Sequence, residues 1–520
     1  DSEMEEDASQ AVAFTSRVIR GAPSESALRA CFSSAGFSAD DLSADDPRVA
    51  LLQCEALAGL NADTLRFLIA RAKVLTYLPH EMIFEQGRPR DAFLVVRSGQ
   101  VLVRVDSPQN SGEREGLAAV SGRGSQEDYP LKPGSSAVGL LCVLASIGTH
   151  GGCASPEACR LHNSSARAGS DGAVLVALPT AALDEAFDAF PEAMRALAQL
   201  LLARLSTVVL ETLSSYFGLH REFLVPSSEL AVVGADAASL AQMKPAEAIL
   251  RALCDGGTGS PDSVLGVSVV AASAEILEFE KGEYAIRLHQ RPSHLLILLE
   301  GELYVEFLSP DVLAGSAPQG NRSGMGSPLQ VVPGNMIGEL SIFLDKPLPL
   351  VYRCGSRCRF AALPRDSVVQ LLDMQPRTCC LRILHIVTAK LAPWLHRVDA
   401  ALDWIRIEGG RSLYHKGDPM RGFFVVLSGR LLVLEESEKH SSAGSDAPPQ
   451  WRVTGSLARG RLCGEFDCLK GMPSYSRTVR ARRDTEVCRV SPALLHLLAM
   501  DFPYSVLHFS LKIAEESRSA

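Results

Sequence analysis

The 520-residue sequence lacks several features that would define a class of protein at once. It has no run of 18 uninterrupted apolar residues, and its best candidate, residues 196–210, contains Gln199 and Arg204. No transmembrane helix is therefore predicted, and no amino-terminal signal peptide is visible. No Cys-x-x-Cys pair occurs among the 13 cysteines. The scattered cysteines and histidines predict reduced thiols, no disulfide scaffold, and no bound metal or other cofactor.

A strong excess of one charge is also missing. The chain has 51 Lys and Arg against 60 Asp and Glu, which gives a net charge of −9. This weak acidity provides no bulk attraction to nucleic acid or to an anionic membrane, so no nucleic-acid partner is expected. A hydrophobic content of 47% with 21% charged residues is typical of globular domains. The length predicts three or four of them.

An internal repeat organises the chain. Three segments share a pattern of two β-rich runs joined at a glycine: Phe84–Val103, Ile286–Val305 and Tyr414–Val433. A spacing of 12 recurs in all three, between Gly87 and Gly99, His289 and Gly301, and Gly417 and Gly429. The pattern predicts hairpins in which the second glycine tolerates a positive φ. His80, Gly282 and Gly410 each lie 19 residues before the second glycine of their copy, so we predict that His80 lies in a turn.

Each copy of the repeat ends in the same way. A strand is followed by a helix at Pro179, Pro364 or Ser491, and a proline 12 residues later opens a longer helix, at Pro191, Pro376 or Pro503. The predicted fold is therefore mainly β with helices. It consists of three tandem jelly-roll β-rolls of about eight short strands, each with appended carboxy-terminal helices.

The copies predict the domain organisation. We expect an amino-terminal extension at 1–59, domains at 60–219, 265–396 and 397–520, and a linker at 220–264 with a short helical patch at Pro245–Leu253. Segments rich in Ser, Gly, Pro and Asn predict solvent-exposed loops at 106–130, 309–328 and 436–450. A second insertion in the first copy is predicted from Gly148 to Gly172.

The hairpin at Gly87…Ser98-Gly99 and the block Pro333-Gly334…Gly338-Glu339-Leu340-Ser341 resemble the cyclic nucleotide-binding domain. The resemblance implies that the Gly-Glu pair opens a phosphate-binding cassette, in which a helix N-terminus offers backbone N–H groups to the cyclic phosphate. It also implies that the glutamate accepts a hydrogen bond from the ribose, and that an arginine nine residues later pairs with the phosphate.

The first two copies depart from this pattern. Copy one has Gly139 followed by Leu140 at the glutamate position, and its next arginine is Arg160. Copy two keeps Gly338 and Glu339 but has Leu348 at the arginine position.

Copy three keeps Gly464 and Glu465 but has Ser474 at the arginine position, and Arg477 follows three residues later. No copy keeps both charged groups, so we predict that the cassettes are degenerate for cyclic nucleotides. The alternative is that the two glycines only shape a structural turn. The candidate ligand-binding residues are Gly338, Glu339, Leu340, Ser341, Gly464, Glu465 and Arg477.

Three such domains in series resemble a narrower group, the regulatory region of neuropathy target esterase and its patatin-like phospholipase relatives. Three stretches carry this likeness: Arg204–Leu219 after the first copy, Arg397–Trp404 between the second and third, and Ser136–Leu144 in the first cassette. Leu348 also matches the leucine of that group. The likeness covers roughly residues 55–515.

The hydrolase of that group requires a Gly-x-Ser-x-Gly nucleophile motif, which this sequence lacks. Asp171-Gly172-Ala173 matches the tripeptide of the partner aspartate, and we take the match as chance. Whether the protein is an enzyme is left open. The chain begins without a Met and ends where the resemblance would begin the hydrolase, so we expect a fragment. A standalone three-domain regulator is the alternative.

The resemblance implies a non-catalytic regulatory region of a lysophospholipase that acts in phospholipid metabolism. The hydrolase domain of the full-length protein would be its partner, and a cyclic nucleotide or another small anion is the candidate ligand. The implied location is the cytoplasm, at the cytosolic face of the endoplasmic reticulum for the full-length protein, with membrane association only through segments outside this chain. The alternatives are a cyclic nucleotide sensor of the protein kinase A regulatory-subunit type and a purely structural interaction array.

Three further features have a structural and a functional interpretation. The apolar helix predicted over Pro191–Leu219 packs on its own barrel, or docks on the next copy, a lid or the hydrolase. Arg482-Arg-Asp-Thr485 matches a loose kinase-inhibitor pattern, but a charged turn between strands is favoured. Trp394 and Trp404 are expected to pack at a domain junction rather than to stack on a nucleotide base.

Overall fold

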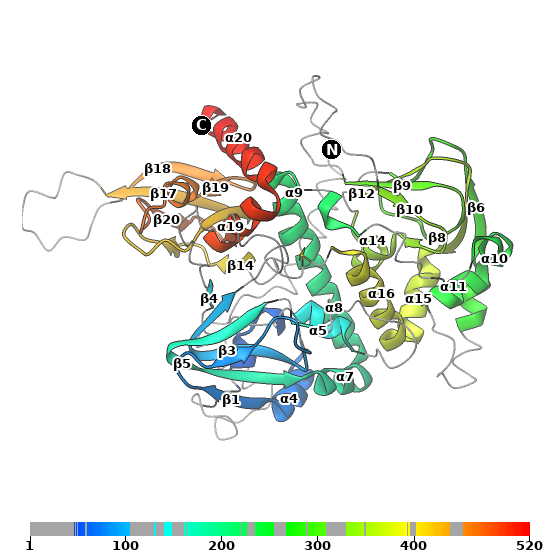
Figure 1. Cartoon of the computed structure of the whole chain (residues 1–520), viewed down its shortest axis with the longest axis horizontal. Helices are drawn as coiled ribbons and strands as arrows, with labels where there is room; N and C mark the ends of the chain where they lie inside the picture. The colour runs from blue at the N-terminus through cyan, green and yellow to red at the C-terminus, as the bar shows by residue number, and fades with distance from the viewer. Residues whose placement is uncertain are drawn as a thin grey trace, which may run out of the picture. The chain divides into compact units, whose positions relative to one another are not determined.

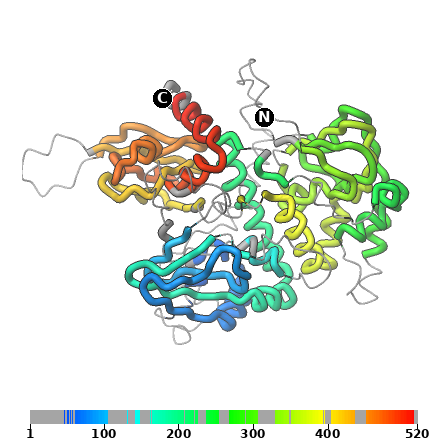
Figure 2. Tube along the Cα trace, in the orientation of Figure 1, coloured from blue at the N-terminus to red at the C-terminus, as the bar shows by residue number. Residues whose placement is uncertain are grey.

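A computed structural model gives the fold. It describes residues 46–104, 129–131, 140–147, 161–225, 233–253, 267–307, 329–347, 350–395, 402–436 and 451–519, apart from single or paired residues within these ranges. Contacts divide the chain into two compact units. The first holds two sets of strands and most of the chain up to Arg397, and the second holds a third set from Val398 onward. We call the strand sets roll one (73–179), roll two (275–364) and roll three (402–490), and they are drawn in Figures 1 and 2.

Roll one is built on two long strands, β3 (Ala92–Arg104) and β5 (Ser165–Pro179), which pair in antiparallel fashion. The sheet order is β1-β5-β3-β4, and β2 also pairs with β5. The other strands are β1 (Lys73–Tyr77), β2 (Met82–Phe84) and β4 (Tyr129–Leu131). Register shifts between Val96 and Ser98 and between Gly99 and Val101 bend β3, as β-bulges do.

Rolls two and three each form two four-stranded sheets within the described residues. The strands of roll two are β6 (Glu275–Phe279), β7 (Tyr284–Ile286), β8 (His294–Glu300), β9 (Leu303–Phe307), β10 (Leu329–Val331), β11 (Met336–Ile337), β12 (Leu350–Cys354) and β13 (Cys358–Pro364). The strands of roll three are β14 (Leu402–Ile407), β15 (Ser412–Tyr414), β16 (Phe423–Ser428), β17 (Arg430–Glu436), β18 (Trp451–Ala458), β19 (Leu462–Cys463), β20 (Thr478–Ala481) and β21 (Thr485–Val490). Phe360 and Phe423 are fully buried in these sheets. The β-roll prediction is confirmed.

The hairpins predicted at the repeat glycines were wrong, because β3 runs through Gly99, and β8 and β9, like β16 and β17, belong to different sheets. The glycine that joins the two β-rich runs nevertheless has the predicted backbone conformation in every copy. Gly99, Gly301 and Gly429 have φ of 79°, 107° and 90°. Close approach adds a second requirement, because a Cβ at Gly99 would lie 2.3 Å from the carbonyl oxygen of Gly172. His80 has φ 64° in its turn, where Gly282 and Gly410 have 90° and 87°, so its predicted position is confirmed.

The predicted carboxy-terminal helix pairs are also confirmed. In roll three, the Ser491 side chain accepts a hydrogen bond from the backbone N–H of Leu494 and caps the first helix. Phe509 on the second helix stacks on Phe423 at a ring separation of 5.0 Å. The pairs are α7 (Thr180–Ala189) with α8 (Pro191–Arg204), α15 (Arg365–Met374) with α16 (Pro376–Lys390), and α19 (Pro492–Asp501) with α20 (Pro503–Ser519).

The predicted linker contains packed helices. Pro245–Leu253 forms α11 as expected, and its Ile249 and Leu253 are buried. This helix contacts β13 and α16, and α10 (Ala237–Gln242) contacts β8. Residues 237–253 therefore belong to the core around roll two rather than to a free connector. The domain bounds as a whole stay a prediction.

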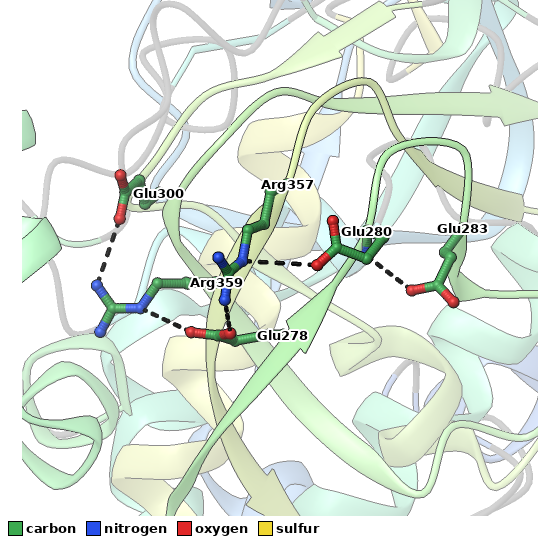
Figure 3. A network of polar contacts seen from close by, with 6 residues as sticks. All are labelled: Glu278, Glu280, Glu283, Glu300, Arg357 and Arg359. Carbon is green, nitrogen blue, oxygen red and sulfur yellow. Dashed lines mark hydrogen bonds and ion pairs between the residues drawn. The ribbon is translucent and has the colours of Figure 1, made fainter.

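A charged network joins three strands of roll two to one another (Figure 3). Arg359 on β13 pairs with Glu278 on β6 at 3.5 Å and with Glu300 on β8 at 3.3 Å. Its Nη1 also donates to the carbonyl oxygen of Ala241 on α10, at 3.0 Å. Arg357 pairs with Glu278 at 2.5 Å. These pairs lie at or near the surface and have a structural role, and each contributes little on its own.

The second insertion predicted in roll one ends earlier than expected. Residues 165–172 are part of β5, and Gly172 (φ 74°) forms its tight bend opposite Gly99. The prediction of an insertion up to Gly172 was therefore wrong, because Ser170 and Gly172 have the composition of a loop but lie within β5, at a register shift opposite β3. The other predicted loops lie almost wholly outside the described residues.

The remaining described helices surround these rolls. Before roll one lie α3 (Ala50–Gln53), the 3-10 turn η2 (Glu55–Leu57) and α4 (Ala62–Arg71). α5 (Leu140–Ala145) lies within roll one, and α8 continues through the π-helical turn η4 (Leu205–Leu210) into α9 (Glu211–Phe217). The 3-10 turn η5 (Arg221–Phe223) follows. In roll two α14 (Glu339–Leu344), and in roll three α18 (Glu465–Leu469), follow a cassette glycine.

Candidate functional site

The cassette of roll two begins at Gly338, between β11 and α14. Its φ of 88° is a left-handed conformation that favours glycine. A Cβ there would lie 3.3 Å from Ile286 Cδ1 and 3.5 Å from the carbonyl oxygen of His294. The backbone therefore turns tightly against β7 and β8 at this point. This turn directs the next side chain, Glu339, into the interior, where it is 5% exposed.

Glu339 is paired with a lysine from its own unit. Its Oε1 accepts a hydrogen bond from Lys390 Nζ at 2.5 Å, and the same ammonium donates to the carbonyl oxygen of Met336. Lys390 is the last residue of α16. The second carboxylate oxygen, Oε2, is buried without a hydrogen-bond partner in the described part of the chain. The carboxylate that the resemblance assigns to a ribose is thus held by an internal cation.

The other polar side chains of this cassette have hydrogen-bond or ion-pair partners within roll two. The Ser341 hydroxyl donates to the backbone carbonyl of Lys346, and Leu340 is half-buried. Asp345, which ends α14 with a φ of 55°, forms an ion pair with Arg365 and lies 3.7 Å from Arg291. Arg291 and Arg365, the arginines near α14, therefore pair with Asp345. Leu348, at the expected arginine position, lies outside the described residues.

In roll three an aromatic side chain lies over the cassette glycine. A Cβ at Gly464 (φ 81°) would lie 3.1 Å from Cε1 of Tyr475. Tyr475 stacks on Tyr414 with ring centroids 3.9 Å apart, and its hydroxyl donates to the carbonyl oxygen of Gly422 at 2.7 Å. Burial raises the pKa of Tyr475 to about 12, so the phenol is neutral at physiological pH. Glu465 at the start of α18 is half-buried and near Tyr414.

The structure does not bring Arg477 to the cassette of roll three. Its side chain is 60% exposed, and its Nε lies 3.5 Å from Glu435 on β17. Ser474, at the expected arginine position, bridges to Pro419 through the backbone. The Ser476 hydroxyl and backbone N–H both donate to Asp467, at 2.8 Å each. The 470–477 segment is therefore held by local hydrogen bonds.

Roll one has an equivalent of the stacked pair that Tyr414 and Tyr475 form in roll three. His162 stacks on Phe84 with ring centroids 4.1 Å apart, as Tyr475 stacks on Tyr414. The backbone N–H of Gly87 donates to the carbonyl oxygen of His162 at 2.9 Å, and the same bond joins Gly417 to Tyr475 at 2.9 Å. Leu161 therefore stands where Ser474 stands in roll three. Leu140 opens α5, whereas Gly139 and Arg160 lie outside the described residues.

The sequence analysis missed Lys390, Tyr475 and His162. Lys390 is a single cation at the end of an apolar helix, which is an ordinary solvated position. An alignment of copy one with copy three would have placed Gly87 opposite Gly417. With the end of each cassette aligned as well, His162 would have stood opposite Tyr475, which marks both as candidates.

The helix α8 of roll one packs against α14 and α16 of roll two, within the same compact unit (Figure 1). Gln199 Nε2 donates to the carbonyl oxygen of Phe343 on α14, at 2.8 Å. Arg377 on α16 pairs with Asp184 and Asp188 on α7, each at 2.6 Å. Both interpretations of this apolar helix hold, because α8 contacts α5 and α7 of its own roll as well as α14 and α16 of the next copy. The cassette helix α14 is contacted by both α8 and α16.

One helix in the described residues, Pro191–Phe217, is long and apolar enough to cross a membrane by length and composition. The prediction of no such helix was therefore too strict, because it required an uninterrupted apolar run. In its most apolar window 65% is buried inside the protein, which is typical of a core helix.

The other interpreted residues have structural roles. Trp394 is buried, and its Nε1 donates to the carbonyl oxygen of Glu222 at 2.7 Å, whereas Trp404 is half-buried in β14. Arg482 and Arg483 lie exposed in the turn between β20 and β21, as predicted, and Thr485 is fully buried. No disulfide joins the cysteines of the described residues, and no group of metal-ligating side chains occurs among them.

Comparison with known proteins finds likenesses to parts of this chain. The family model of the cyclic nucleotide-binding domain matches residues 404–501, which contain most of roll three. Roll three is therefore similar in sequence to the cyclic nucleotide-binding domain over these residues.

Curated relatives give a narrower likeness. Human patatin-like phospholipase domain-containing protein 6 is 29% identical over 174 residues, which are 34% of this chain and 12% of that protein. Lysophospholipase NTE1 of Kluyveromyces lactis is 28% identical over 244 residues, 47% of this chain and 16% of that protein. The chain thus matches less than a fifth of the length of either relative. The regulatory domain of Toxoplasma gondii PKA with cAMP is 16% identical, with 54% of this chain and 99% of that chain covered and a TM-score of 0.20.

Proposed function

We propose that this chain is the non-catalytic regulatory region of a neuropathy target esterase-like lysophospholipase, with cyclic nucleotide pockets that have lost their ligand. The main observation in favour of this loss is the ion pair between Glu339 and Lys390, at 2.5 Å. A ribose hydroxyl would have to compete with a charged internal donor, and a charge-assisted hydrogen bond is about twice as strong as a neutral one.

The relatives support the phospholipase part of the proposal. Those named above are phospholipases by description, which favours this function over a regulator of the protein kinase A type. The third β-roll supports the regulatory part, because its sequence matches a ligand-binding domain. In roll three, however, the ring of Tyr475 packs against the cassette glycine Gly464.

The proposal extends to the whole protein. A serine hydrolase domain would be covalently linked to this region and would be its partner. The full-length protein would act in phospholipid metabolism at the cytosolic face of the endoplasmic reticulum. Membrane attachment would come from segments outside this chain.

Titration of the purified chain with cAMP and cGMP by isothermal calorimetry tests the loss of ligand. No saturable binding with Kd below about 10 μM is expected. The matched variant is Lys390→Met, which frees Glu339 from its internal partner. Tight binding of either nucleotide to the wild type would overturn the proposed loss and favour the sensor function.

The coding sequence that follows Ala520 tests the enzymatic context. A Gly-x-Ser-x-Gly motif in a hydrolase domain is expected there. In the full-length protein, replacement of that serine by alanine should abolish hydrolysis of lysophosphatidylcholine. An open reading frame that ends without such a domain would refute the lysophospholipase assignment. Fluorescence microscopy of the tagged full-length protein tests the location.

A further inference from the structure

Roll two has an exposed serine hydroxyl on the segment that joins β7 to β8. Ser293 is exposed and is the last residue before β8. Its Oγ lies 2.9 Å from Nδ1 of His294, and Nε2 of His294 lies 3.4 Å from a carboxylate oxygen of Glu275 on β6. In the neutral ring with its hydrogen on Nε2, Nδ1 accepts from the hydroxyl. The imidazole therefore holds the hydroxyl in a defined orientation at the surface.

The backbone of Ser293 lies at the beginning of α15. The N–H of Arg365, the first residue of this helix, donates to the carbonyl oxygen of Ser293 at 2.9 Å. His294 stands opposite Pro364, the N-cap residue of α15, in the ladder of β8 and β13. A proline cannot cap a helix through its side chain, and the start of a helix favours a nearby negative charge. An anionic group on Ser293 would therefore lie at a favourable place.

Two arginine side chains also originate next to Ser293. Arg291 precedes it by two residues, and Arg365 is bonded to it through the backbone. Both guanidinium groups pair with Asp345, which ends α14: Arg365 through a direct ion pair, and Arg291 at 3.7 Å. The Asp345 side chain is 65% exposed, so each of these pairs contributes little. A stronger anion at Ser293 would compete for both arginines.

The equivalent position in copy one carries a permanent acidic residue. Ser293 lies eight residues before Gly301, and Asp91 lies eight residues before Gly99. The same backbone bond supports the equivalence, because the N–H of Thr180, the first residue of α7, donates to the carbonyl oxygen of Asp91 at 2.8 Å. Asp91 is exposed. The β-roll therefore tolerates an anionic side chain at the start of its first carboxy-terminal helix.

We propose that Ser293 is a phosphorylation site, and that the phosphoserine pairs with Arg365 and Arg291 in place of Asp345. Arg287 and Arg291 precede the serine by six and by two residues, which suits a protein kinase that selects basic residues before its target. In the reaction the Ser293 oxygen attacks the γ-phosphorus of ATP held by the kinase. The new O–P bond replaces the bond to ADP, and the hydroxyl proton passes to the catalytic base of the kinase.

The exchange of partners would act on the helices of roll two. A phosphoryl group adds about −1.5 to −2 charges at pH 7 and three acceptor oxygens, and guanidinium groups pair with it in bidentate fashion. Asp345 at the end of α14 would lose its arginines, and the first turn of α15 would gain an anion. Because α14 contacts α8 and α16, the modification would reach the contact between rolls one and two within the same compact unit. The proposal is independent of the proposed function, because neither a nucleotide nor a hydrolase takes part.

Incubation of the purified full chain with ATP and a panel of arginine-directed serine kinases tests the site. Phosphopeptide mapping by mass spectrometry should place a phosphoryl group on Ser293 of the folded chain. Ser293→Ala should remove it. The matched control Ser273→Ala changes another exposed serine, whose Oγ lies 2.9 Å from Ser367 Oγ on α15, and should keep it. Phosphate on Ser293 only after heat unfolding, or from no kinase of the panel, would overturn the site.

Hydrogen exchange of the phosphorylated and unmodified chains tests the exchange of partners. The amides at the end of α14 should exchange about threefold faster, and those in the first turn of α15 about threefold slower. Ser293→Asp should give smaller changes in the same directions. Asp345→Asn removes the competing carboxylate without adding a phosphate, so it should speed exchange in α14 and leave α15 unchanged. Exchange in α14 and α15 that is the same before and after phosphorylation of Ser293 would refute the switch of ion pairs.

Discussion

Lys390 and Glu339 join the end of α16 to the start of the cassette helix α14, through an ion pair of 2.5 Å. The side chains are 19% and 6% exposed. The pair therefore couples the position of a carboxy-terminal helix to the conformation of the cassette without a ligand. In a pocket that binds a cyclic nucleotide, the Glu339 carboxylate would have to be available to the ligand.

Replacement of Lys390 by Met should destabilise α14 locally by about 3 kcal/mol, because the buried carboxylate of Glu339 loses its counter-charge. Hydrogen exchange of the α14 amides reports this as faster opening. The double variant Glu339→Leu/Lys390→Met removes both charges and should recover most of the lost stability. Equal protection in the wild type and the single variant would contradict the role of the pair.

Replacement of His80 by Gly should raise the stability of roll one by about 0.5 kcal/mol. A non-glycine residue in the left-handed region costs about 1 kcal/mol, which the greater freedom of glycine in the unfolded chain partly offsets. The side chain is exposed, so no packing is lost. The mirror control is Gly282→Ala in roll two, where a Cβ meets nothing within 4 Å. That variant should lose stability by a similar amount, as measured by thermal unfolding, and a loss in His80→Gly would refute the argument.

The repeat could be predicted from the sequence because each of its structural requirements restricts the residue type at one position. A positive φ and a close backbone approach both require glycine at Gly99, Gly301 and Gly429. The helix starts are marked in the same way, since proline is tolerated in the first turn and Ser491 can cap.

The internal partners of the cassettes could not be predicted in this way. Lys390 and Glu339 are far apart in sequence, and only the path of α16 brings them together. The stacking of His162 on Phe84 likewise depends on where the 161–162 segment returns to the sheet. The sequence suggested Arg477 as a ligand residue because it is near Ser474, but the chain bends at 476–477 and the Arg477 side chain pairs with Glu435 on β17.

Replacement of Tyr475 by Phe should cost roll three about 1 kcal/mol. The ring stacking on Tyr414 is kept, but the buried hydroxyl bond to the carbonyl oxygen of Gly422 is lost. Replacement by Ala should cost about 3–5 kcal/mol, because a cavity opens beneath Gly464. Urea unfolding of the two variants measures both values. Similar losses would mean that the hydroxyl rather than the ring holds the 470–477 segment.

Acid should destabilise roll one through His162. Its pKa is about 4 in the folded protein against 6.5 as the ordinary value. Between these two values the unfolded chain binds more protons than the folded chain, so stability is full above about pH 6.5 and falls as the pH is lowered toward 4. The total loss is about 3 kcal/mol, from 1.36 kcal/mol per pKa unit. The variant His162→Tyr installs the residue of roll three and removes this titration, so its stability should change less between pH 7 and 4.5 than that of the wild type. Chemical unfolding of both proteins across this range measures the difference, and parallel pH profiles would show that His162 is not the group responsible.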